Sequence, residues 1–326
     1  MPGLTDKNSV KDQMNRLGRA GKRFIFIIDF DLQNPILIED RNFNSPDVLF
    51  NIRGYTNYIT SAVNKPLEFI GHPVTYNKYL KAFNRIIDEL QAGNSYLVNL
   101  TFPTKISTNF SLKELFHYSV APYKLLYKNS FLVFSPECFV RIKNGFIHTY
   151  PMKGTIDAKI KNAGEVLLSD KKETAEHATI VDLLRNDLSI VAKNVNVDRF
   201  RYLDKIKTSS KTLLQMSSEI SGELPVNFRE NLGDILFSLL PAGSICGAPK
   251  IKTLDIIRKV EDYDRNYYTG VFGYFDGENL DSAVMIRFIE NTKNGFVYKS
   301  GGGITASSEP EKEYQELIDK VYVPVN

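Results

Sequence analysis

The hydrophobic positions of the chain follow two periods, one typical of helices and one typical of strands. Residues 76–90 repeat apolar side chains at helical spacing and end just before Gly93, which favours an amphipathic helix. The pair Ser308 and Glu311 has the spacing of a capping box and predicts the start of a helix at the end of the chain. The helices expected after the first one cover residues 171–187, 231–240, 250–260 and 309–322.

Strand-like segments are more numerous than helical ones. Residues 23–30 (RFIFIIDF) form a run of β-branched and aromatic side chains that predicts a buried strand, and Asn144-Gly145 is a hairpin turn signal. The other segments expected to be strands are 95–102, 130–134, 138–142, 145–150, 195–203, 213–221, 268–275, 282–290 and 295–300. Because strands mostly follow strands through short turns, the order predicts an α+β fold with largely antiparallel sheets.

Composition and charge narrow the class of protein. The 326 residues allow one large domain or two, and no Pro/Gly/Ser-rich linker marks a boundary. With 41 Lys+Arg against 38 Asp+Glu and no long basic run, a protein that binds nucleic acid through phosphates is disfavoured. The sequence has no window of 18 consecutive apolar residues, so no membrane span is predicted. The polar N-terminus lacks the apolar core of a signal peptide. Two distant cysteines, Cys138 and Cys246, point to a reduced, cytoplasmic compartment.

The helix expected over residues 171–187 has carboxylates in its apolar face. At about 100° per residue, Glu173 and Glu176 share a face with Ile180 and Leu184. Two like charges beside a core need a cation, a proton or water. The alternative, a helix start that favours acidic residues and is open to solvent, stays open from position alone.

The last helix offers a second pair of carboxylates. Glu313, Glu316 and Lys320 form a stripe next to its apolar face. Two such helices facing each other supply the oxygen ligands that Mg²⁺ prefers. A solvated edge with an ordinary Glu316–Lys320 pair is the competing interpretation of this stripe.

The glycine-rich segments do not match nucleotide-binding motifs. Residues 243–250 (GSICGAPK) lack the Gly-Lys-Ser/Thr of a phosphate loop, and Gly301-Gly302-Gly303 lacks dinucleotide-site spacing. Three glycines after a strand instead offer backbone N–H groups to an anion, or form a flexible turn. Lys153 lies between a predicted strand end and a glycine, where a solvated surface lysine is the simplest interpretation.

Several of these segments, in this order, resemble the chorismate-utilising enzymes. The resemblance covers residues ~93–320, and the first ~75 residues match weakly. It implies one large α+β domain with two packed, mostly antiparallel sheets flanked by helices, in which 1–75 is the N-terminal part and 76–326 the chorismate-binding catalytic region. The matching stretches are SPECFVRI (135–142), PMKGT (151–155), EHATIVDLLRNDL (176–188), GSICGAPK (243–250), YTGVFGYF (268–275), AVMIR (283–287), SGGGI (300–304) and EKEYQELIDK (311–320).

Lys153 decides the branch of the family that the chain resembles. It stands where the aminodeoxychorismate synthase component I branch has lysine and anthranilate synthases have alanine, although Met152 replaces the branch's isoleucine. The resemblance implies amination of chorismate with ammonia from a glutamine amidotransferase subunit, on the way to 4-aminobenzoate and folate. Anthranilate synthase component I and an isochorismate or salicylate synthase are the alternatives.

The resemblance also implies roles for particular residues. Lys153 would be the nucleophile, with a pKa lowered by burial or cations, and Glu137 the general acid/base with a raised pKa. Glu176 and Glu316 would bind Mg²⁺ directly, assisted by Glu173 and Glu313. Gln215 replaces a histidine common in the family and cannot shuttle a proton. The substrate-binding positions are Gly154, Thr155, Gln215, Tyr268, Arg287, Gly302, Gly303 and Lys320, with Lys250 as a weaker candidate.

Overall fold

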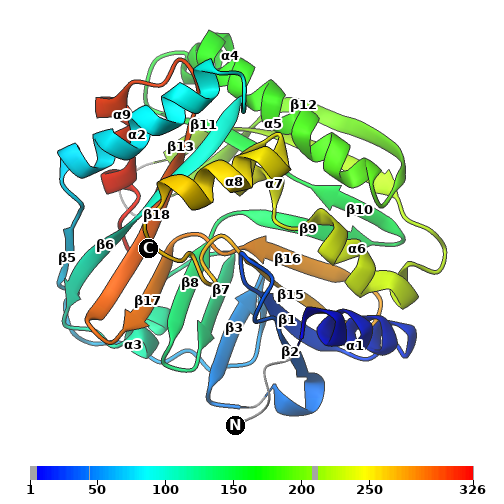
Figure 1. Ribbon diagram of the computed structural model, residues 1–326. Helices are drawn as coiled ribbons and strands as arrows, with labels where there is room; N and C mark the ends of the chain where they lie inside the picture. The colour runs from blue at the N-terminus through cyan, green and yellow to red at the C-terminus, as the bar shows by residue number, and fades with distance from the viewer. Residues whose placement is uncertain (1–5, 44, 208–211, 326) are drawn as a thin grey trace.

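The computed structural model describes residues 6–43, 45–207 and 212–325, and its strands form two large sheets (Figure 1). Within this described part, each sheet has nine strands and every pair is antiparallel. Sheet A contains, in spatial order, β11 (Met152–Asp157), β13 (Thr212–Glu223), β10 (Phe146–Thr149), β9 (Cys138–Lys143), β16 (Leu280–Val284), β15 (Val271–Phe275), β1 (Phe24–Ile28) and β2 (Ile36–Glu39), with β12 (Lys193–Lys207) paired to β13.

Sheet B packs against sheet A. It contains β14 (Gly247–Ala248), β6 (Leu97–Thr108), β18 (Gly295–Ile304), β17 (Phe288–Thr292), β8 (Phe131–Ser135), β7 (Tyr123–Tyr127), β3 (Val48–Ile52) and β4 (Tyr55–Thr56), with β5 (Phe69–His72) paired to β6. The predicted α+β fold with two packed antiparallel sheets is confirmed.

An apolar layer holds the two sheets together. Ile25 and Phe272 of sheet A lie in one buried cluster with Phe50, Leu125 and Val133 of sheet B, and all five side chains are fully buried. Alternate residues of each strand point to the same face, so this layer uses only one face of each sheet. The opposite faces remain for helices.

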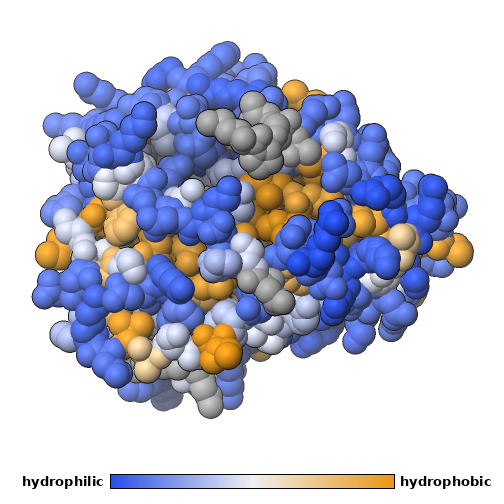
Figure 2. Space-filling view, turned by 90° about the horizontal axis from the view of Figure 1, so that it is seen from below, coloured by the Kyte–Doolittle hydropathy of each residue, from blue (hydrophilic) through white to orange (hydrophobic). Residues whose placement is uncertain are grey.

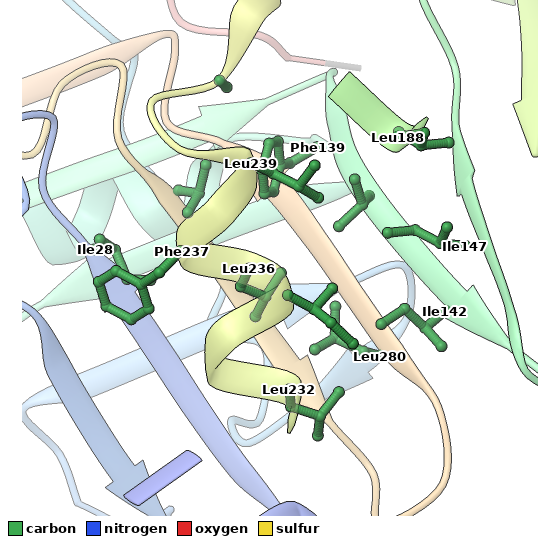
Figure 3. Close-up of a cluster of buried hydrophobic side chains, with 14 of the residues drawn as sticks. Ile28, Phe139, Ile142, Ile147, Leu188, Leu232, Leu236, Phe237, Leu239 and Leu280 are labelled. Carbon is green, nitrogen blue, oxygen red and sulfur yellow. The ribbon is translucent and has the colours of Figure 1, made fainter. Parts of the chain in front are cut away.

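Helices cover both outer faces, which gives four layers. Phe26 and Ile28 of sheet A pack with apolar side chains of α1, α5 and α6, and Figure 3 shows Leu232, Leu236 and Leu239 of α6 in this cluster. The outer face of sheet B packs against α2, α3, α8 and α9. The α-helices are α1 (Lys7–Arg19), α2 (Tyr76–Gln91), α3 (Leu112–Tyr118), α4 (Ala163–Ser169), α5 (Lys171–Ser189), α6 (Leu232–Leu239), α7 (Gly243–Cys246), α8 (Lys250–Val260) and α9 (Pro310–Asp319). Two short 3₁₀ turns cover Asp40–Asn42 and Phe228–Asn231.

Two local sequence predictions are wrong. The predicted capping box at the last helix does not form, because α9 starts at Pro310 after Glu309, and the Ser308 hydroxyl donates to the Glu313 carboxylate instead. The segment 282–290 is not one strand, since it leaves sheet A after Val284 and enters sheet B at Phe288. The first error arises because Ser308 binds a carboxylate within the helix rather than its first backbone amides, and the second because the chain crosses from one sheet to the other.

The chain crosses between the two sheets at two places, and each crossing contains a residue that lines the cavity described below. After β8 of sheet B it passes through Pro136 and Glu137 into β9 of sheet A. It returns from β16 to β17 through residues 285–287, where Arg287 has a left-handed backbone with φ 53°. The Val284 amide donates to the Glu137 carbonyl oxygen (3.2 Å), so the two crossings lie side by side.

The face of the molecule seen in Figure 2 is mostly hydrophilic, with hydrophobic residues exposed in its middle and at a few points along its edge. In the described part of the chain, none of the helices combines the length and apolar character needed to span a bilayer.

Candidate active site

One large cavity, of about 1040 Å³, lies between the ends of the two sheets. Strand β11 and helix α5 border it on the side of sheet A, and β18 and α9 border it on the side of sheet B, in the upper part of Figure 1. The structure brings together in its lining Glu137, Lys153, Gly154, Thr155, Glu173, Glu176, Gln215, Tyr268, Arg287, Gly302, Gly303, Glu316 and Lys320. Of the residues that the sequence analysis assigns to the site, Glu313 and the weaker candidate Lys250 lie outside this lining.

Strand β11 presents Lys153 to the cavity through a bulge. The register of β11 on β13 shifts between Lys153 and Thr155, and Gly154 in between has φ 74°. A β-carbon at Gly154 would lie 2.8 Å from a carboxylate oxygen of Glu173. The backbone conformation therefore favours glycine here, and any side chain would displace the Glu173 carboxylate.

Lys153 forms an ion pair with a carboxylate of α5. Its Nζ lies 2.8 Å from Glu176 Oε2, and the Glu176 side chain is only 11% exposed. Burial acts to lower the pKa of Lys153, but the charges of Glu176, Glu316 and Glu173 outweigh it and leave the pKa raised. The expectation of a lowered pKa is thus wrong for this state. The glutamates of α5 face the site, not open solvent.

Glu137 occupies the sheet crossing at the base of the cavity. Burial raises the pKa of its carboxyl group, against the opposing effects of the Ser244 hydrogen bond and the charges of Arg287 and Lys320. The Ser244 hydroxyl on α7 donates to Glu137 Oε1 at 2.7 Å. A partly buried carboxyl group with a raised pKa, fixed by one donor, suits the general acid expected from the family resemblance.

Arg287 and Tyr268 supply donors next to Glu137. The Arg287 guanidinium lies 5.3 Å from the centre of the Tyr322 ring, and among the described residues its buried Nε has no hydrogen-bond partner. Burial raises the pKa of Tyr268, so its hydroxyl group stays protonated near neutral pH. An arginine with an unused donor in a cavity is suited to a carboxylate ligand.

Helix α9 contributes the opposite wall. Lys320 Nζ lies 2.6 Å from Glu316 Oε1 and donates to the Gly301 carbonyl oxygen at 2.8 Å, so the predicted helix pair forms within the cavity lining. A β-carbon at Gly302 would lie 3.6 Å from carboxylate oxygens of both Glu313 and Glu316. Glu313 is buried behind the lining and accepts a hydrogen bond from Ser308.

The four glutamates fit a hard divalent ion by their chemistry. Glu173 and Glu176 approach from α5 and Glu316 from α9, and all three act on the charge of Lys153, so carboxylates of both helices meet at one place. In the side-chain arrangement of the described residues, no three His, Cys, Asp or Glu side chains already form a metal-binding group. Carboxylate oxygens on two facing helices are nevertheless the donor type that Mg²⁺ takes.

One candidate residue lies away from the cavity, and two residues at the site were not predicted from the sequence. Lys250 lies outside the cavity lining, where its Nζ binds Asp187 (3.0 Å) and the Leu239 carbonyl oxygen. Ser244, within the quoted GSICGAPK stretch, had no expected role but contacts Glu137. Asn99 also lines the cavity and donates to the Ile245 carbonyl oxygen at 2.9 Å, a contact that no local motif indicates.

A model of the chorismate binding enzyme family matches residues 55–326. The chain belongs to this family. A protein of Pasteurella multocida described as an uncharacterized PabA-like protein is 52% identical over 315 residues, which are 96% of this chain and 97% of that one. Aminodeoxychorismate synthase component 1 of Salmonella typhimurium is 32% identical over 264 residues, 76% of this chain and 57% of the relative.

Solved structures support the same fold. The menaquinone-specific isochorismate synthase of Escherichia coli matches with a TM-score of 0.73 at 15% identity, over 97% of this chain and 81% of that one. Anthranilate synthase component I of Streptococcus pneumoniae matches with a TM-score of 0.64 at 26% identity, over 79% of this chain and 59% of that one. The family resemblance read from the sequence is confirmed, and the chain is an enzyme of the family that acts on chorismate.

Proposed function

We propose that this chain is an aminodeoxychorismate synthase component I, which converts chorismate and ammonia to 4-amino-4-deoxychorismate for 4-aminobenzoate and folate synthesis in the cytoplasm. The observation that carries this proposal is Lys153, held on the β11 bulge inside the cavity, with its Nζ 2.8 Å from Glu176. A solvated surface lysine would not lie in a cavity within the influence of three carboxylates, those of Glu176, Glu316 and Glu173.

Substrate binding rests on the donors around the crossing of the two sheets. Arg287 and Tyr268 are suited to one carboxylate of chorismate, and the backbone N–H groups near Gly303 to an anionic group at the other wall. Gly154 and Thr155 border the ring beside Lys153, and Gln215, opposite Thr155 on β13, offers its amide without acid–base chemistry.

The first step forms a bond between Lys153 and the substrate. The Lys153 ammonium first gives up a proton, for which the Glu176 carboxylate is the base within hydrogen-bonding distance. The neutral amine then adds at C2 of the ring, the two ring double bonds each shift by one position, and the C4 hydroxyl leaves as water with a proton from Glu137. Ser244 stabilises the carboxylate that Glu137 becomes.

The second step replaces the lysine with ammonia. Ammonia adds at C4, the two ring double bonds shift back, and the C2–N bond breaks. The new ammonium group at C4 returns a proton to the Glu137 carboxylate, and Glu176 returns its proton to the released Lys153 amine. The sum is chorismate plus ammonia to aminodeoxychorismate plus water, and the enzyme is regenerated.

A separate glutamine amidotransferase subunit would supply the ammonia. Releasing ammonia from glutamine by the usual route needs a reactive cysteine thiolate. Burial raises the pKa of the Cys246 thiol to about 12 and also raises the pKa of Cys138, so neither thiol of the chain has that character.

The glutamates of α5 and α9 would hold Mg²⁺. Glu176 and Glu316 are the proposed direct ligands, and Glu173 and Glu313 the supporting ones. When bound there, the ion supplies positive charge for the ring carboxylate of chorismate. The chain's own part is to keep these carboxylates at one wall of the cavity and Lys153 beside them.

The experiment that tests the proposal compares Lys153→Ala with the unchanged protein in the presence of chorismate, Mg²⁺ and ammonium. We expect the variant to form anthranilate or no product, because ammonia can then add only at C2 directly. Lys159→Ala, which removes an exposed lysine, is the matched control and retains aminodeoxychorismate formation. Aminodeoxychorismate at an unchanged rate from Lys153→Ala would overturn the lysine mechanism.

A further inference from the structure

A strained bulge in sheet A lies outside the cavity lining but next to the elements that carry the glutamates. The register of β12 on β13 shifts between Arg199 and Tyr202. Within this shift Arg201 has φ 53°, a left-handed backbone conformation that is unfavourable for a residue with a side chain. Such a conformation persists only where the surrounding contacts enforce it, and it often serves a nearby functional group.

The Arg201 side chain bridges two helices. Its Nη2 donates to the Leu168 carbonyl oxygen in the last turn of α4 and to Thr174 Oγ1, at 2.8 Å, in the first turn of α5. One guanidinium group therefore fixes the bend between α4 and α5. The normal extended conformation at Arg201 would point this side chain elsewhere, since successive residues of a strand face opposite sides.

The backbone of the same bulge fixes α5 at a second point. The Arg201 amide donates to Ser218 Oγ at 3.0 Å, and Ser218 Oγ is also hydrogen-bonded to His177 Nε2 at 2.7 Å. His177 is fully buried, and the ring of Phe200 lies 6.0 Å from its ring. The bulge thus holds α5 at Thr174 and, through Ser218, at His177.

These two anchor points adjoin the two carboxylates of α5. Glu173 directly precedes Thr174, and Glu176 directly precedes His177. Because a helix turns as a rigid body, fixing Thr174 and His177 sets the direction in which Glu173 and Glu176 project. The contacts on the opposite side of those carboxylates are the Gly154 bulge and Lys153.

We infer that Arg201 is a positioning residue, whose strained bulge aims Glu173 and Glu176 into the cavity and so sets the affinity of the site for a divalent ion. The inference rests on the metal assignment in the proposed function. It assigns to Arg201 no contact with substrate or metal. Its effect passes through Thr174, Ser218 and His177.

The test measures binding of Mn²⁺ alone to the full chain by electron paramagnetic resonance, with no chorismate present. Loss of a residue that orients metal ligands typically costs about tenfold in metal affinity, so Arg201→Ala is expected to raise the Mn²⁺ Kd about tenfold. Thr174→Val removes only one acceptor of the guanidinium, keeps the side-chain shape, and is expected to raise the Kd about threefold. If Arg201→Ala fails to fold, the Mn²⁺ affinity of Thr174→Val still tests the inference.

Arg199→Ala is the matched control. This arginine belongs to the same bulge but is exposed, with its guanidinium 3.7 Å from the centre of the Tyr202 ring. We expect it to bind Mn²⁺ like the unchanged protein. Thermal unfolding of every variant separates a loss of stability from a loss of metal affinity.

The possible results differ in what they overturn. Weaker Mn²⁺ binding in Arg201→Ala and Thr174→Val, with Arg199→Ala unchanged, supports the inference. A lower unfolding temperature with unchanged Mn²⁺ affinity makes Arg201 merely structural and overturns it alone. Absence of Mn²⁺ binding by the unchanged protein overturns the metal assignment of the proposed function, and this inference with it.

Discussion

Replacing Ser244 with alanine tests whether the carboxyl group of Glu137 is the general acid. The change deletes the hydroxyl that donates to Glu137 Oε1 at 2.7 Å and leaves the rest of the short helix α7 intact. This hydrogen bond favours the carboxylate over the acid, so its loss adds to the effect of burial, which already raises the pKa of Glu137.

The size of the effect follows from the energy of that bond. A hydrogen bond to a charged group contributes about 1.5–3 kcal/mol, and part of it remains when the acid is protonated. A difference of about 1.4 kcal/mol between the two protonation states corresponds to one pH unit. Glu137 must be protonated to act, so activity falls as pH rises through its pKa. The alkaline limb of kcat/KM should therefore move upward by about one pH unit in Ser244→Ala.

The assay is the initial rate of chorismate consumption between pH 6 and pH 10 with saturating Mg²⁺ and ammonia. Ser244→Thr keeps the hydroxyl group and should keep the alkaline limb of the unchanged enzyme. If the limb of Ser244→Ala stays in place, or moves to lower pH, Ser244 does not tune the acid and Glu137 is not the group that this limb reports.

Three further predictions address stability, backbone strain and metal dependence. Burial, with a smaller effect from the charge of Arg201, lowers the pKa of His177 from 6.5 to about 4 in the folded protein. Between these two pH values the unfolded chain binds more protons than the folded one. The free energy of unfolding therefore rises with pH in this window, by up to about 3 kcal/mol. His177→Gln should flatten this pH dependence in urea unfolding, and an equally steep curve would contradict it. Gly154→Ala should reduce turnover by more than about tenfold, because its β-carbon meets Glu173 at 2.8 Å, whereas Gly145→Ala, with φ 82° and no atom within 4 Å, should lose only stability. Removing divalent ions with EDTA should stop chorismate consumption and Mg²⁺ should restore it, while full activity in EDTA would refute the metal role.

Much of the site was predictable from the sequence, but mainly through the family resemblance. Position alone favoured a surface lysine at Lys153, whereas the motifs shared with the family pointed to Lys153, Glu137 and Gly303, and the structure brings all three to one cavity. The α+β class followed from the succession of strands and turns. The apolar faces of 76–90 and 171–187 gave helices that the structure places within a few residues of those bounds.

The contacts between distant segments were not predictable in this way. Ser244 reaches Glu137 across 107 positions, and Arg201 reaches Leu168 across 33, and in neither case does a spacing along the chain indicate the partner. The lysine pKa was misjudged for the same reason, because its direction depends on how closely Glu176 approaches from another element. Local rules also mislead at Ser308, whose hydroxyl binds Glu313 rather than capping a helix.

The most direct test of the account is the product that the purified chain forms from chorismate, Mg²⁺ and ammonium, identified by liquid chromatography and mass spectrometry. The assay is run with and without an aminodeoxychorismate lyase. The account predicts aminodeoxychorismate, which the lyase converts to 4-aminobenzoate. Anthranilate or isochorismate as the product would contradict the role given to Lys153, while absence of product both alone and with a glutamine amidotransferase subunit would contradict the proposed activity itself.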